Sequence, residues 1–208
     1  MSVHGLPSST QIRKPVHKKL LYTKFSVELS GDKRKQFDED IGRIIITNEI
    51  SPVSVNVKEG EQVKSIFVLQ VELKNKAYNE RNIVLISKLF GQHLLIALTY
   101  GDEVQLATYQ TRLLHSDWRP ADIVNIKLTG LDLDTVWEGM VTQVSGIVVA
   151  GDNSLDEQIV IEQEKAKLLK QIEDLEKKTR KETQSKKKFE MFQRIKEYQE
   201  RLEQMLKN

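Results

Sequence analysis

Along the chain, the longest apolar run bounded by turn-like residues lies in residues 63–74, VKSIFVLQVELK, and it is polar at only one end. Successive side chains of a strand point to opposite faces, and here one face is wholly apolar: Phe67, Leu69, Val71 and Leu73. The other face begins with Ile66 and Val68 and continues with Gln70, Glu72 and Lys74. We predict a central strand whose second face becomes polar toward its end. That polar end is either a strand entering water or the edge of an active site.

A helix and a short strand are predicted before this central strand. In residues 33–50, apolar residues recur at spacings of three and four, which is typical of an amphipathic helix: Phe37, Ile41, Ile44 and Ile45. The alternating Val53, Val55 and Val57 predict a short strand. The turn-like residues 58–62 would then join it to the central strand as an antiparallel pair. Residues 1–16, with their Gly, Pro and Ser, predict an irregular arm.

The segments directly after the central strand predict a helix and a hairpin. Residues 75–91 place their apolar residues on one side and finish at Gly91, which predicts a helix with a glycine cap. Two apolar segments, 93–100 and 103–110, flank Gly101-Asp102 and predict a β-hairpin.

A further strand and helix are predicted before a polar break. Residues 123–128, IVNIKL, predict a strand. Residues 133–148 have a strong helical periodicity with Asp132 or Asp134 at its start, which predicts a helix packed on the sheet. The polar residues 151–154 separate this part from the C-terminal segment. We therefore predict an α+β domain, a mixed sheet with packed helices, over residues 1–150.

The rest of the chain, residues 151–208, is predicted to be a helical coiled-coil extension. Two stretches repeat apolar residues as heptad seams do: Ile161, Leu168, Ile172 and Leu175, then Met191, Ile195, Tyr198, Leu202 and Met205. Residues 177–188, KKTRKETQSKKK, lie between them and carry no seam residue. The tail is either one long helix, solvated in its middle, or a helical hairpin whose seams pack on each other.

Composition excludes several classes of protein. The 208 residues include 32 Lys and Arg against 30 Asp and Glu, so there is no global attraction to nucleic acid or membranes. The lack of Cys removes disulfides, thiolate zinc sites and Cys nucleophiles. No window reaches the roughly 18 apolar residues of a membrane span, and the N-terminus lacks the apolar segment of a signal peptide. We expect a cytoplasmic protein without a membrane partner.

Two local windows are nevertheless basic. In the first, residues 13–24, lysines alternate with apolar and aromatic residues, and the candidate binding residues are Lys18, Lys19 and Lys24. The second, residues 176–188, holds seven Lys or Arg against two Glu, and its candidates are Arg180, Lys181, Lys186, Lys187 and Lys188. Each window contacts either a nucleic acid or an acidic partner, or is simply solvated.

The sequence offers little support for catalysis. The four His residues have no partners at metal-ligand spacing, and phosphate-loop, esterase and dinucleotide motifs are lacking, so we expect no metal site and no cofactor. Glu72-x-Lys74 matches the E-x-K half-motif of restriction-endonuclease-like nucleases, in which a carboxylate holds Mg²⁺ and a lysine polarises the attacking water. Such a nuclease needs a second acidic ligand upstream, for which Glu49, Glu59 and Glu61 are the candidates. The alternative is that Glu72 and Lys74 form a paired, solvated strand end.

Several segments together resemble a bacterial family known only as domain of unknown function 4391. They are GLPSSTQIRKPVHKKLLY, DIGRIIITNEISPVSVNV, VKSIFVLQVELK, LFGQHLLIAL and LTGLDLDTVWEGMV. The resemblance extends over nearly the whole chain, including the charged tail. It implies a small protein encoded beside an SNF2-like helicase and a DNA methyltransferase in restriction or phage-defence loci. It supplies no active-site residues.

We therefore expect a non-catalytic accessory subunit that docks on a helicase or methyltransferase partner. Coiled-coil seams bury apolar stripes against another helix, so the tail would mediate this docking or self-association into a homo-oligomer. The basic windows would steer the assembly toward DNA. The alternatives are a Mg²⁺-dependent nuclease that uses Glu72 and Lys74, and a plain DNA-binding protein.

Overall fold

The computed structural model describes residues 3–91, 93–151 and 153–207, which divide into two compact units. The first unit is Met1–Gly146 and the second is Ile147–Asn208. No helix among the described residues is both long enough and apolar enough to cross a membrane.

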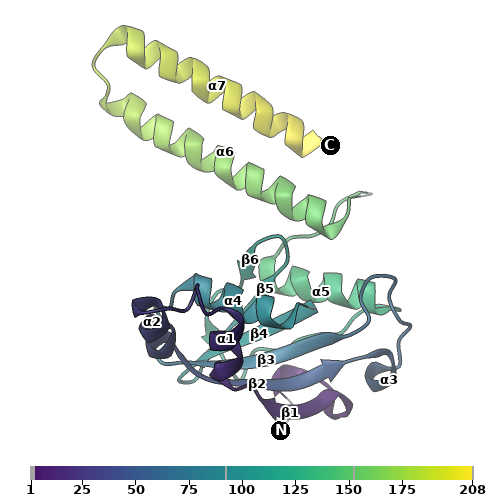
Figure 1. Cartoon of the computed structure of the whole chain (residues 1–208). Helices are drawn as coiled ribbons and strands as arrows, with labels where there is room; N and C mark the ends of the chain where they lie inside the picture. Colours follow the sequence, from purple (N-terminus) through teal and green to yellow (C-terminus); the bar gives the residue numbers. More distant parts are fainter. Residues whose placement is uncertain (1–2, 92, 152, 208) are drawn as a thin grey trace. The chain divides into compact units, whose positions relative to one another are not determined.

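In the described part of the first unit, seven strands form one mixed sheet (Figure 1). They are β1 (Gln11–Pro15), β2 (Ile41–Ile50), β3 (Ile66–Leu73), β4 (His93–Tyr100), β5 (Glu103–Tyr109), β6 (Leu113–His115) and β7 (Arg119–Pro120). The strand order is β1-β2-β3-β4-β5-β6, and β7 pairs with β5. Strands β3 and β4 are parallel, and the other neighbours are antiparallel. The central position predicted for residues 63–74 is therefore confirmed.

Three of the described helices, those that contain Leu21, Phe37 and Ile83, cover one face of this sheet. The helical elements of the unit are η1 (Val3–Gly5), η2 (Ser8–Thr10), α1 (Lys18–Lys24), α2 (Asp32–Asp40), α3 (Pro52–Val55), α4 (Glu80–Phe90) and α5 (Leu133–Ser145). Leu21 of α1, Phe37 of α2 and Ile83 of α4 are fully buried in one cluster. The cluster also contains the strand residues Leu69, Val71, Leu73, Ile96 and Leu98. This face of β3 is the one that the alternation predicted to be apolar.

The opposite face of the sheet is covered only in part. Leu95 and Ala97 of β4 alternate with the helix-facing residues and are also buried. Helix α5 contacts β5 and β6, and its Trp137 lies edge-on to His93, with ring centroids 5.1 Å apart. The part of this face next to the ends of β3 and β4 is polar and open.

The predictions after the central strand are largely confirmed. Helix α4 lies within residues 75–91 and ends at Gly91, which adopts the left-handed conformation of a C-cap. Strands β4 and β5 form the hairpin at Gly101-Asp102. Asp132 begins α5 with a capping box in which its side chain and that of Thr135 bond each other's backbone.

The helix predicted over residues 33–50 is wrong in its second half. Helix α2 ends at Asp40, and the isoleucine-rich remainder is strand β2. The β2–β3 register shifts between Ile41 and Ile44, so that both, three positions apart, are buried in the helix-covered cluster. These irregularities give a strand the apolar spacing of a helix. The β-branched isoleucines favour the strand once β3 is available to pair with them.

Two predicted strands are also wrong. Residues 53–57 do not form a strand, because Ser51 and Ser54 make a capping box and Pro52 opens the short helix α3. The antiparallel partner of β3 is β2 instead. Residues 123–128 have no regular structure. The arm predicted over residues 1–16 contains the edge strand β1.

The second unit is a helical hairpin formed by α6 (Leu155–Lys181) and α7 (Ser185–Lys207). The two helices contact each other, and the seam residues Leu168, Ile172 and Ile195 are buried. Arg201 of α7 lies 3.5 Å from the carboxylate of Glu164 of α6. Of the two arrangements that the sequence allowed, the folded-back one is observed, with the turn at residues 182–184. Supercoiling of the coiled-coil type stays a prediction.

Candidate functional site

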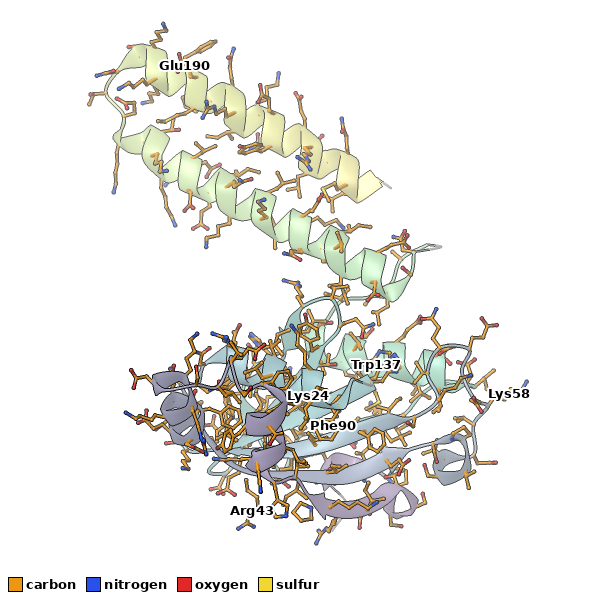
Figure 2. All side chains as sticks on the ribbon, viewed as in Figure 1. Lys24, Arg43, Lys58, Phe90, Trp137 and Glu190 are labelled. Atoms are coloured by element: carbon orange, nitrogen blue, oxygen red, sulfur yellow. The ribbon has the colours of Figure 1, made fainter. Side chains whose placement is uncertain are left out.

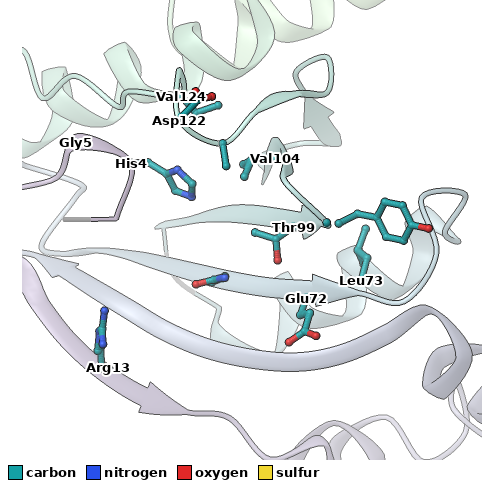
Figure 3. A pocket seen from close by; sticks show the side chains of 13 residues that line it. His4, Gly5, Arg13, Glu72, Leu73, Thr99, Val104, Asp122 and Val124 are labelled. Carbon is teal, nitrogen blue, oxygen red and sulfur yellow. The ribbon is translucent and has the colours of Figure 1, made fainter. Parts of the chain in front are cut away.

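A cleft of about 920 Å³ opens on the face of the sheet that α1, α2 and α4 do not cover (Figure 3). Its polar side chains are His4, Arg13, Gln70, Glu72, Thr99, Tyr100 and Asp122. We call it the Glu72 cleft. Glu72 and Thr99 are neighbours at the carboxyl ends of the parallel strands β3 and β4. The carboxyl ends of parallel strands are the usual position of ligand sites in α/β sheets.

Arg13 reaches the cleft because strand β1 is irregular. The β1–β2 register shifts between Gln11 and Lys14, and Arg13 within this shift has a φ of 46°. A positive φ in a residue other than Gly is uncommon, and such residues concentrate at functional sites. Bulges of this kind re-aim a side chain, and here the side chain is a guanidinium that lines the cleft.

His4 forms another wall of the cleft and also has a positive φ, 51°. Its carbonyl accepts a hydrogen bond of 2.8 Å from the N–H of Ile126, which ties the N-terminal arm to the loop before α5. Burial lowers the pKa of the His4 imidazole, although a hydrogen bond to the backbone of Ala121 opposes the shift. His4 is therefore mainly neutral at pH 7. In Figure 3 its ring points into the cavity.

Most charged groups of the cleft have no partner within the protein. Among the described residues, Arg13, Gln70, Glu72 and Asp122 make no side-chain hydrogen bond or ion pair. The helix-covered side of the sheet differs, since Asp38 there bonds both Lys18 and Tyr22. The cleft therefore presents unsatisfied donors and acceptors of both signs. The backbone of Glu72 is closely packed on β2, since a Cβ added at Gly42 would lie only 3.1 Å from the carbonyl oxygen of Glu72.

The structure does not assemble the nuclease site around Glu72 and Lys74. Glu72 lines the cleft, whereas the ammonium of Lys74 donates to the backbone carbonyl of Asp38 at 2.6 Å, outside the lining. Asp40 precedes β2 near the end of β3, but its carboxylate accepts hydrogen bonds from Asn79 and Asn82. The lysine and the nearby aspartate that an E-x-K mechanism could use are therefore hydrogen-bonded to other parts of the protein.

The proposed upstream ligands lie at the other end of β3. Glu49 pairs with Phe67, five residues before Glu72, which is about 16 Å along a strand. Glu59 forms an ion pair with Lys64, and Glu61 also precedes β3. Within the part of the chain that the structure describes, no group of three or more His, Asp or Glu side chains could hold a metal ion.

A second concavity, of about 950 Å³, lies between α1 and α4 on the helix-covered side. Its apolar lining consists of Pro15, Val16, Leu20, Ile46, Phe67, Leu89 and Phe90. Lys14, His17, Lys19, Thr23 and Lys24 complete it, so its lining among the described residues includes no acidic side chain. We call it the α1–α4 groove. Lys24 and Phe90, labelled in Figure 2, belong to it, and Leu20 is 56% exposed.

The three candidate lysines of the first basic window differ in what they contact. Lys18 bonds Asp38 at 2.9 Å and the carbonyl of Ile41, which joins α1 to the corner between α2 and β2. Lys24 donates to the carbonyls of Lys88 and Leu89 and so caps the C-terminus of α4. Lys19 is exposed on the rim of the groove. The sequence did not reveal the groove, because its lining comes from four separate segments of the chain.

The second basic window is brought together by the turn of the hairpin. Arg180 and Lys181 end α6, and Lys186, Lys187 and Lys188 begin α7. The first turn of α7 contains no acidic residue, so these lysines oppose the positive end of the helix dipole. We call these five residues the hairpin tip. Within the described residues Arg180 has one weak partner, Glu176 at 3.8 Å.

The polar cleft residues that the sequence did not single out are His4, Arg13, Thr99, Tyr100 and Asp122. A lone Arg or His in a Pro- and Ser-rich arm carries no spacing signal, and Asp122 lies in a segment that was predicted to precede a strand. Only Glu72 and Gln70 were marked beforehand, by their position on the polar half of β3.

Comparison with known proteins identifies the family of this chain. No curated protein and no solved structure matches it. The family model described as Domain of unknown function (DUF4391) matches residues 5–202, which include both units almost entirely. The chain therefore belongs to this family.

Proposed function

We propose that the protein is a non-catalytic accessory subunit that binds another protein through the α1–α4 groove. The observation that supports this proposal is the groove itself, in which Leu20, Phe67 and Phe90 line an open apolar surface. Apolar surfaces with polar rims are typical of protein interaction sites. The family resemblance implies an SNF2-like helicase or a DNA methyltransferase as the partner.

The charges around the groove suggest the chemistry of the partner segment. Lys14, Lys19 and Lys24 contribute only positive charge to its lining. An apolar segment flanked by Asp or Glu would bury its apolar side chains in the groove and place its carboxylates near these ammonium groups. The hairpin seams are less suitable for docking, because Leu168, Ile172 and Ile195 are already buried.

Replacing Leu20 by Asp should weaken partner binding at least 100-fold, because docking would then desolvate an unpaired carboxylate. The measurement is calorimetric titration of the full chain with the purified helicase and methyltransferase of the same locus. Val53→Asp is the matched control, since Val53 is 94% exposed and lies in α3, outside the groove. Lys19→Glu should also weaken binding. Full-strength binding by Leu20→Asp would refute the proposal.

A second candidate function, DNA binding through the hairpin tip, is favoured by the turn that joins two basic runs. Changing Lys186, Lys187 and Lys188 together to Ala should weaken binding to duplex DNA equally for all sequences. It should also reduce the slope of log K against log salt by about three, one for each lost phosphate contact. Gel shifts over a salt series measure both. A triple Ala variant of the exposed Lys33, Lys127 and Lys170 is the control. An equal loss of DNA affinity in this control would contradict DNA binding through the hairpin tip.

A further inference from the structure

The unpaired groups of the Glu72 cleft are arranged by charge. Arg13 supplies a guanidinium from β1, whereas Glu72 and Asp122 supply carboxylates from β3 and the loop before α5. No ion pair within the described residues joins Arg13 to either carboxylate. In Figure 3, Arg13 and Glu72 lie apart from each other, and Asp122 lies across the opening. The cleft thus separates one cationic position from two anionic ones.

The cationic position suits a phosphate. A guanidinium offers a planar fork of N–H donors that matches two phosphate oxygens. Arg13 is held in a left-handed conformation at the register shift of β1, so its side chain is directed by the backbone rather than by a protein partner. Strain maintained at an unpaired arginine is expected where the arginine serves a ligand.

The anionic positions suit hydroxyl groups. An ionised carboxylate only accepts hydrogen bonds, and a sugar offers several hydroxyl donors close together. A second anion would be repelled by Glu72 and Asp122, so the ligand must carry its negative charge at one end only. Between the two ends, the unpaired amide of Gln70 can donate and accept, whereas the neutral imidazole of His4, which already bonds the backbone of Ala121, can only accept through its other nitrogen.

The volume of the cleft sets the size of the ligand. About 920 Å³ is at the upper end of the range of roughly 300 to 1,000 Å³ that is usual for small-molecule sites. We infer that the Glu72 cleft binds a phosphorylated sugar, either free or as part of a nucleotide, with its phosphate at Arg13 and its sugar hydroxyls at Glu72 and Asp122. This inference does not depend on the proposed docking of a protein in the α1–α4 groove.

Calorimetric titration of the full chain with defined probes tests the inference. The probes are ribose 5-phosphate, the four nucleoside monophosphates, the corresponding nucleosides and inorganic phosphate. At least one sugar phosphate or nucleotide should bind with one site per chain and at least tenfold more tightly than inorganic phosphate. Equal affinities of ribose 5-phosphate and the nucleotides would identify the sugar phosphate as the recognised unit. Tighter binding of a nucleotide would show that the cleft also recognises the base.

Variants distinguish the two ends of the cleft. Arg13→Gln should weaken the binding of every phosphorylated probe at least tenfold. Glu72→Gln should weaken the binding of the sugar phosphate while leaving the affinity for inorganic phosphate unchanged. Lys14→Ala is the matched control, since Lys14 is the next residue of β1 but lines the α1–α4 groove. Leu20→Asp should bind the ligand like the unaltered chain, which separates this test from that of the protein partner.

Two outcomes would overturn the inference. One is that no phosphorylated probe binds at millimolar concentration. The other is that Arg13→Gln and Lys14→Ala weaken binding equally, which would show that the anion is attracted non-specifically by positive charge. Because Arg13 is exposed, its replacement should leave the thermal unfolding midpoint close to that of the unaltered chain, and this midpoint is recorded for every variant.

Discussion

Replacing Asp40 by Ala should lower the free energy of unfolding of the first unit by about 3 kcal/mol. One oxygen of this buried carboxylate accepts hydrogen bonds from the N–H of Asn79, at 2.9 Å, and from the side-chain amide of Asn82, at 2.8 Å. Asn79 is the N-cap of α4, so Asp40 joins the start of β2 to the start of that helix. Alanine would leave both donors without a partner. Urea denaturation followed by tryptophan fluorescence measures the change.

Asp40→Asn is the control for this prediction. The amide oxygen of Asn can occupy the same position and accept both bonds, and only the charge is lost. We therefore expect a loss of about 1 kcal/mol for Asn, which separates the hydrogen bonds from the charge. An Ala variant as stable as the unaltered chain would contradict the structural role of Asp40.

Replacing Ile195 by Asp should separate α7 from α6 and unfold most of α7. Ile195 is 6% exposed, and burying an unpaired carboxylate in its place costs several kcal/mol. An isolated helix gains little stability in water without packing of its apolar face, so α7 would lose helicity once it leaves α6. Far-ultraviolet circular dichroism and hydrogen exchange along residues 185–207 measure this loss.

Phe192→Asp is the matched control, on the same helix and three residues before Ile195. Phe192 is 55% exposed, so an aspartate there remains in water and the hairpin should stay closed. If both variants kept full helicity, the burial of Ile195 would not stabilise the hairpin. The tail seams would then be available for an external helix, as a coiled-coil docking role requires.

Local sequence signals predicted the elements whose cause is local. Asp132 caps α5 and Gly91 ends α4, because capping depends on a few neighbouring side chains and on the freedom of Gly at positive φ. The alternation in β3 predicted both its strand conformation and its helix-covered face. By contrast, β2 was predicted as a helix, because register shifts place Ile41 and Ile44 on one face at a helical spacing. Such shifts are set by pairing with β3 and leave no local signal.

The candidate sites also combine features that local sequence predicts with features that depend on tertiary structure. Glu72 was marked by the polar end of β3, but its cleft also needs Arg13 and Asp122, which are far from it in sequence. The hairpin tip was visible as a basic window, whereas its compact form depends on the turn between α6 and α7.

By itself, then, the sequence determined the α+β class, the core face of β3, the capped helices and the family, because periodicity and capping act over a few residues. Only the tertiary structure decided that the tail folds back, that Lys74 bonds the backbone of Asp38 instead of lining the cleft with Glu72, and that an arginine of β1 lines that cleft. The physical reason is that these features arise from strand pairing and helix packing between distant segments, whose energies no short window of sequence contains.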